Sequence, residues 1–112
     1  MKVSFSTEDK TSGIIRKKVH VMVHFDVDLS SEEKRVIQEN DFSDLILAEP
    51  SDPAGVGIPI RVHEFLKKNH VQRLVSTKYD AQILISEMQE GLKGLKNGLE
   101  TAITETTGSF EL

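Results

Sequence analysis

The longest hydrophobic period in this chain lies in residues 77–104, TKYDAQILISEMQEGLKGLKNGLETAIT. Counted from Ala81, apolar residues recur at alternating intervals of four and three, at Ile85, Met88, Leu92, Leu95, Leu99 and Ala102. This spacing places them on one side of an α-helix. Thr77 and Asp80 have the spacing of a helix-capping pair. We therefore predict one long helix over 77–104 whose apolar stripe packs against a sheet.

Three glycines lie inside this predicted helix. Gly91, Gly94 and Gly98 each precede a leucine, so they form a second stripe about 100° around the helix from the leucines. Each interior glycine costs roughly 1 kcal/mol relative to alanine, so a compensating contact is expected. Two interpretations stay open. Either this bare face, together with Leu95, packs against a second copy in a homodimer, or the helix frays or bends over 91–98.

The clearest strand lies nearer the N-terminus. Every second residue from 19 to 29 is apolar, namely Val19, Val21, Val23, Phe25, Val27 and Leu29. The opposite face carries Lys18, His20, Met22, His24, Asp26 and Asp28. Alternation of this kind predicts a half-buried antiparallel strand. We expect it to form a hairpin with a strand at 2–6, after a connecting turn at 7–13.

The rest of the chain predicts shorter elements. Ser30 or Ser31 caps a short helix, with Glu32 and Glu33 in its first turn and Val36 and Ile37 facing inward. The later elements are a central strand at 45–48 buried on both faces, a loop at 49–57, a strand at 58–62, a helical turn at 63–69 and a strand at 71–75. Residues 105–112 are either a mobile tail or a late strand.

These elements predict a single α+β domain over residues 1–112. Its sheet is mostly antiparallel with four or five strands. The long C-terminal helix packs on one face of that sheet, and the short helix follows the second strand.

Composition excludes several classes of function. The chain has no cysteine, which removes disulfides, zinc–thiolate sites, iron–sulfur clusters and cysteine nucleophiles. A net charge of −4, one tyrosine and no tryptophan disfavour nucleic acid. No apolar run is long enough for a membrane span, and the N-terminus lacks the apolar core of a signal peptide. We therefore expect a cytoplasmic protein.

The outer face of the 19–29 strand holds the candidate ligand-binding residues, His20, Met22, His24 and Asp26. His20 and His24 lie four strand residues apart, or roughly 13 Å, which is too far to chelate one metal ion. We therefore predict no metal site. Residues 55–57 (GVG) lack the third glycine and the helix of a phosphate-binding loop, so we expect no cofactor.

Three hypotheses for function follow. The leading one is a non-enzymatic, homodimeric binding or accessory module, with a small-molecule or protein ligand on the open sheet face. The alternative is a small cofactor-independent enzyme in which His20 or His24 acts as general base beside Asp26. The third is a protein-interaction partner that uses its C-terminal tail.

Overall fold

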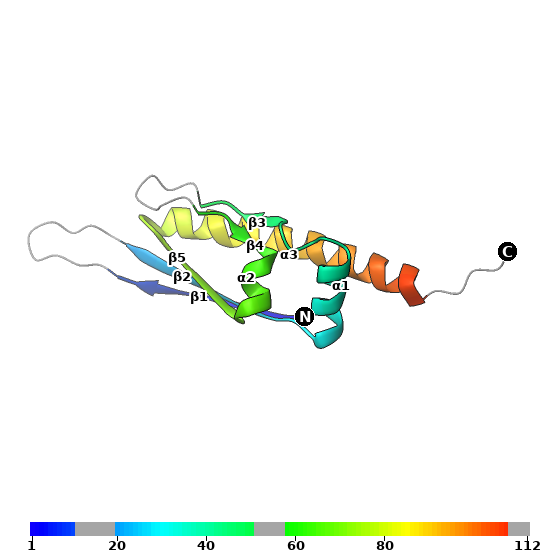
Figure 1. Cartoon of the computed structure of the whole chain (residues 1–112). Coiled ribbons are helices and arrows are strands. Elements are labelled where there is room, and N and C mark those ends of the chain that lie inside the picture. Colours follow the sequence, from blue (N-terminus) through cyan, green and yellow to red (C-terminus); the bar gives the residue numbers. More distant parts are fainter. Residues whose placement is uncertain (11–19, 51–57, 108–112) are drawn as a thin grey trace, which may run out of the picture.

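The computed structural model describes residues 1–10, 20–50 and 58–107, which adopt an α+β fold (Figure 1). In chain order the elements are β1 (Lys2–Asp9), β2 (Val21–Asp28), α1 (Ser31–Glu39), β3 (Ile46–Ala48), β4 (Ile60–Arg61), α2 (Val62–Lys67), β5 (His70–Val75) and α3 (Lys78–Thr107). The predicted fold class is confirmed. The predicted tail at 105–112 is wrong for residues 105–107, because α3 continues to Thr107. Residues 108–112 of that tail, most of the predicted loop at 49–57, residues 11–13 of the predicted turn, and Lys18 and Val19 of the predicted strand lie outside the described residues.

The strands form two sheets. The larger has the order β1-β2-β5, and both of its pairings are antiparallel. Lys2 lies opposite Asp28 in the predicted hairpin, and Asp26 lies opposite His70 across β2 and β5. β3 and β4 form a separate antiparallel pair. The five strands of the described residues thus pair antiparallel throughout, where a mostly antiparallel sheet was predicted, but they are divided between two sheets.

β1 is longer than its side-chain pattern predicts. Residues 7–9, which we assigned to a connecting turn, continue the strand, and the backbone N–H of Lys10 still donates to the carbonyl of His20 at 2.7 Å. The alternating run of β2 offers a partner along this whole length. Backbone pairing therefore extends β1 past the point where its own apolar pattern ends.

The core lies between β2 and α3. Every second residue of β2 is buried, as predicted, and faces the helix. The buried residues of α3 are Ala81, Leu84, Met88, Leu92, Leu95, Leu99 and Ala102. Leu84 therefore takes the core position that we predicted for Ile85. The physical reason is the helix's placement over β2, β3 and β5, which leaves Ile85 partly buried on the side of β1.

The predicted central strand at 45–48 is wrong. β3 pairs only with β4 and packs on one side against α3, where Leu47 and Ala48 are buried. Leu45 and Ile46 are 47% and 43% exposed. The continuous apolar run reflects contact with a helix on one side rather than burial inside a sheet. The predicted strand at 58–62 is likewise reduced to β4, because Val62 begins α2.

The glycines of α3 have three different environments, and the helix is unbroken through all of them, so it does not fray there. A Cβ on Gly91 would overlap the carbonyl oxygen of Leu47 and lie 2.8 Å from its Cα. A Cβ on Gly98 would lie 3.6 Å from the ring of Phe42, and one on Gly94 would have no atom within 4 Å. The close backbone approach expected at this stripe therefore occurs within the chain, between Gly91 and β3.

Both predicted helix caps are present. The hydroxyl of Ser30 accepts from the N–H of Glu33 at 3.1 Å, and the Glu33 carboxylate accepts from the N–H of Ser30 at 3.0 Å. The hydroxyl of Thr77 accepts from the N–H of Asp80 at 3.0 Å. These contacts satisfy backbone donors that a helix start leaves unpaired. Among the residues described, no helix combines the length and the apolarity that crossing a membrane requires.

Candidate functional site

The side of the large sheet that faces away from α3 is called here the outer face. Because directly opposed residues share a face, the strand register assigns eleven side chains to it. They are Lys2, Ser4, Ser6 and Glu8 from β1, Met22, His24, Asp26 and Asp28 from β2, and His70, Gln72 and Leu74 from β5. Figure 1 shows α2 and α3 on the opposite side of the sheet. Polar and titratable groups from three strands therefore share one surface that no described helix covers.

Four side chains on the outer face form a continuous hydrogen-bonded row, the two-histidine cluster: Glu8, His24, His70 and Asp26. His70 Nδ1 lies 2.8 Å from Asp26 Oδ1, and His70 Nε2 lies 3.2 Å from His24 Nδ1. His24 Nε2 lies 3.4 Å from Glu8 Oε1. The two ring centroids are 5.2 Å apart. The row leads from Asp26 on β2 to His70 on β5, back to His24 on β2 and then to Glu8 on β1, so one carboxylate lies at each end.

Hydrogen-bond counting fixes how many protons the two-histidine cluster holds when every contact is made. Each imidazole–carboxylate contact needs an N–H on the ring, and the contact between the rings needs one N–H and one bare nitrogen. The two histidines then carry three N–H groups together, which is one more than two neutral rings have. The fully bonded cluster therefore holds one positive charge on its rings between two negative carboxylates.

The carboxylates at the ends of the cluster are accessible. The side chains of Glu8 and Asp26 are 50% and 53% exposed, whereas that of His24 is 20% exposed. Hydrogen bonding to Lys10, whose Nζ lies 3.2 Å away, is the main cause that lowers the pKa of Glu8, and the contact with His24 lowers that pKa further. Glu8 is thus held as an anion. The described contacts of the cluster engage one oxygen of each carboxylate.

The structure brings together some of the predicted binding residues and not others. His24 and Asp26 belong to the two-histidine cluster, and Met22 is half-buried on the same face. His20 precedes β2, where its carbonyl accepts from Lys10, and it makes none of the cluster's hydrogen bonds given above. The imidazole that Asp26 orients is that of His70, not that of His24 as we expected for the enzyme hypothesis.

Sequence reasoning missed Glu8 and His70. Glu8 fell in the segment assigned to a turn, and His70 lies one residue before the predicted strand at 71–75. The signal that finds both is the pairing register, which sets Glu8 opposite Met22 and His70 opposite Asp26. That register depends on strand order, which local patterns do not contain. His63, the remaining histidine, lies on α2, and its Nδ1 is enclosed with no hydrogen-bond partner among the described residues.

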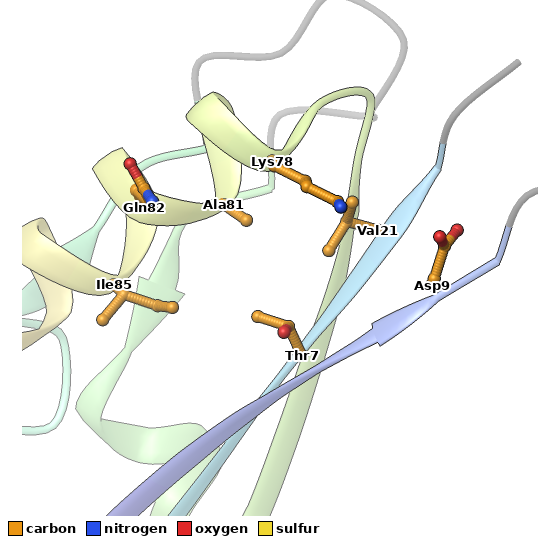
Figure 2. Close-up of a pocket in the computed structure, with 7 residues that line it drawn as sticks. All are labelled: Thr7, Asp9, Val21, Lys78, Ala81, Gln82 and Ile85. Atoms are coloured by element: carbon orange, nitrogen blue, oxygen red, sulfur yellow. The ribbon is translucent and has the colours of Figure 1, made fainter.

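A groove lies on the other side of the sheet, between β1 and α3. A cavity of about 190 Å³ lies at one end of it. Figure 2 shows the residues that line this cavity, Thr7, Asp9, Val21, Lys78, Ala81, Gln82 and Ile85. A wider recess of about 470 Å³ lies farther along, lined by Met1, Val3, Phe5, Gln89, Leu92, Lys93 and Lys96. Both recesses exist because α3 covers β2 and leaves the inner face of β1 open.

Within the described residues, no group of three or more His, Asp or Glu side chains is arranged to hold a metal ion. Comparison of the chain with protein-family models, curated proteins and solved structures found no match.

Proposed function

We propose that this protein is a non-enzymatic binding module whose outer face binds a protein partner through lysine or arginine side chains. The observation that carries the proposal is the two-histidine cluster, a hydrogen-bonded row of two imidazoles between two exposed carboxylates on a sheet face that no described helix covers.

The shape of the outer face favours a protein partner over a small molecule. Three neighbouring strands make a broad surface. Its recess beside Lys2, Asp26 and Asp28, of about 330 Å³, is smaller than the recess of about 470 Å³ between β1 and α3 on the other side of the sheet. Leu74 is 42% exposed and shares its row with Met22 and Glu8, so an apolar strip lies next to one acidic end of the cluster. Apolar area beside a few fixed polar groups is typical of protein–protein surfaces.

The exposed carboxylate oxygens of the outer face favour basic side chains on that partner. Glu8, Asp26 and Asp28 face outward there, beside Lys2 and beside Lys10, whose Nζ lies 3.2 Å from Glu8. The second oxygen of Glu8 and of Asp26 can accept a charge-assisted hydrogen bond, worth about 1.5–3 kcal/mol when the pair is desolvated. A guanidinium or ammonium group meets this requirement.

The engagement of the imidazoles supports binding over catalysis. All four ring nitrogens of His24 and His70 already have partners, so neither ring presents a bare nitrogen to a substrate. One observation keeps the enzyme as a second candidate. The contact between His24 and Glu8 is the longest in the row at 3.4 Å. Breaking it, with loss of the Nε2 proton, would leave a bare His24 Nε2 that can act as a general base. An activity that Glu8→Gln preserves and His24→Gln abolishes would favour that candidate.

Selection of peptides from a random library displayed on phage tests the binding proposal without a known partner. The wild-type protein serves as bait, and the double variant His24→Gln/Asp26→Asn serves for counter-selection. We expect peptides enriched in Lys and Arg whose affinity falls about tenfold or more for the double variant. The affinity of the selected peptides is also measured for Gln72→Ala on the outer face. Gln38→Ala on α1 is the control for this variant, since both glutamines are exposed. Peptides that bind the double variant as tightly as the wild type would refute the proposal.

We further propose that the module is a cytoplasmic homodimer. The dimer interface predicted on the glycine face of α3, which consists of Gly91, Gly94, Gly98 and Leu95, stays a prediction. Gly91 lies against Leu47 and Gly98 faces Phe42 of the same chain, and Leu95 is buried in the core, so Gly94 is the open position of this face. The C-terminal tail also stays a prediction as an alternative partner site. Slower hydrogen exchange over residues 105–112 on addition of a partner would support it.

A further inference from the structure

We propose that two copies of this protein associate by antiparallel pairing of β1 with β1, with Phe5 of both copies at the two-fold axis. The inference rests on the proposed homodimer and gives that homodimer an interface. The interface lies at the free edge of β1, and it shares only Glu8 with the site proposed on the outer face.

β1 is an unprotected edge strand. Among the described residues it pairs with β2 alone, and all eight of its residues are exposed. Its charged residues lie at its two ends, while residues 3–7 (VSFST) carry no charge and no proline. Native edge strands are usually blocked by such residues or by a covering segment. The middle of β1 has neither within the described part of the chain, so it is suited to pair with another strand.

The hydrogen bond from Lys10 to His20 identifies which backbone groups of β1 are free for such pairing. In an antiparallel ladder, hydrogen-bonded and non-hydrogen-bonded pairs alternate. Because Lys10 and His20 are opposed and bonded, the even-numbered residues of β1 direct their N–H and C=O groups toward β2. The odd-numbered residues Val3, Phe5 and Thr7 direct theirs toward the open edge.

The same residues present apolar side chains. Val3 and Phe5 face the α3 side of the sheet and are 43% and 45% exposed. They line the recess of about 470 Å³ beside Leu92. A second β1 strand would lie directly beside them, since directly opposed residues in an antiparallel pair have Cβ atoms about 5 Å apart. Pairing therefore buries apolar surface and satisfies backbone groups at one interface.

Charge selects the register. In a two-fold pair that keeps the apolar residues on one face, opposed residues must have the same parity. With Phe5 on the axis, Lys2 lies opposite the second copy's Glu8, Val3 lies opposite Thr7, and Phe5 lies opposite Phe5. With Ser6 on the axis, Lys2 lies opposite Lys10 instead. Only the Phe5 register pairs opposite charges, twice by symmetry, and it forms about six backbone hydrogen bonds.

The resulting dimer has one continuous sheet with three strands from each copy. Both α3 helices lie on the same side of it, and both two-histidine clusters lie on the other. Lys2 of the second copy approaches Glu8, the carboxylate at one end of the cluster. The outer faces of the two copies thus form one surface.

Light scattering coupled to gel filtration tests the interface, with 12.5 kDa expected for the monomer and twice that mass for the dimer. We expect the wild type to be dimeric at about 100 µM and to dissociate on dilution. Phe5→Pro removes an N–H that points away from β2, a position where edge strands tolerate proline, so we expect a folded monomer. Gly94→Lys is the control on the glycine face and is expected to stay dimeric.

Charge exchange tests the register and does not depend on the fold of the proline variant. Lys2→Glu places like charges opposite each other at two sites, and we expect the dimer dissociation constant to rise about tenfold. The double variant Lys2→Glu/Glu8→Lys restores the opposite charges and should restore dimerisation. Tighter association of Lys2→Glu alone would indicate the Ser6 register and overturn the proposal.

The remaining outcomes separate this inference from the proposed function. A monomeric wild type would refute both the homodimer and the β1 interface, while peptide binding to the outer face would be unaffected. A dimer that survives Phe5→Pro and dissociates with Gly94→Lys would place the interface on the glycine face. That result would refute the β1 interface and leave the proposed homodimer standing.

Discussion

Substitution of the α3 glycines by alanine tests the placement of β3 on the long helix. Alanine in a helix interior is about 1 kcal/mol more favourable than glycine. At Gly94 nothing lies within 4 Å of the new methyl group, so we expect about 1 kcal/mol of added stability. At Gly98 the methyl would make an ordinary contact with the Phe42 ring at 3.6 Å, and a similar gain is expected.

Gly91→Ala should have the opposite sign. Its methyl group would overlap the Leu47 carbonyl oxygen and lie 2.8 and 2.9 Å from the Leu47 Cα and carbonyl carbon. These are backbone atoms, which cannot rotate away as the end of a side chain can. Overpacking costs about 1–3 kcal/mol, and backbone displacement puts the cost near the upper end. Subtracting the helix gain of about 1 kcal/mol leaves a net loss of about 2 kcal/mol.

Urea unfolding followed by circular dichroism at 222 nm measures these free energies, with thermal unfolding as a second measurement. A difference of about 3 kcal/mol between Gly91→Ala and Gly94→Ala corresponds to roughly 12 °C in Tm for a chain of this size. Equal stabilisation by the two substitutions would show that β3 does not contact the helix at Gly91. Destabilisation by Gly94→Ala would show that another surface, such as a second α3, occupies the space beside it.

Two further substitutions test contacts that join elements. Partial burial raises the pKa of Glu33, but hydrogen bonding from Ser30 and the amino group of Met1 lowers it more, so the net pKa is depressed. The carboxylate thus stabilises the fold above pH 4.5, and that contribution disappears as the pH falls through the folded pKa. Glu33→Gln should cost about 0.5–1 kcal/mol at pH 7 by urea unfolding. A deficit that does not shrink as the pH is lowered below 4.5 would contradict this reasoning. Arg73→Met should lower the free energy of unfolding by about 1–2 kcal/mol. The Arg73 guanidinium lies 2.9 and 3.0 Å from the two carboxylate oxygens of the half-buried Glu64. A double-mutant cycle with Glu64→Gln that shows no coupling would contradict this prediction.

The proposed dimer interface and the outer-face site both use residues of β1. The odd residues of β1 present apolar side chains and free backbone groups, while the even residues place Glu8 in the two-histidine cluster. A strand separates these roles cleanly, because successive side chains point to opposite faces. Variants at the odd residues of β1 should therefore change assembly. Variants at the even residues should change outer-face binding, except that Lys2 and Glu8 also affect assembly through their charge pair across the two copies.

Local periodicity was enough to predict the main elements. The period of two from Val19 to Leu29 indicated a strand with one buried face, and the alternating three and four from Ala81 indicated the long helix. The capping residues Ser30 and Thr77 could also be predicted from sequence, because a helix cap is a contact between residues three apart in the chain. These features depend on neighbours in sequence, so they predicted the α+β class.

The tertiary structure alone decided the remaining features, because they depend on which distant segments become neighbours. The pairing of β2 with β5 brings His70 to Asp26, 44 residues away in sequence, and the full length of β1 brings Glu8 to His24. The approach of β3 explains Gly91, whose lack of a side chain had pointed to a second copy of the helix. An isolated sequence pattern records that a residue is small or polar. The partner that makes its size or charge matter is chosen when the chain packs, by strand order and helix placement.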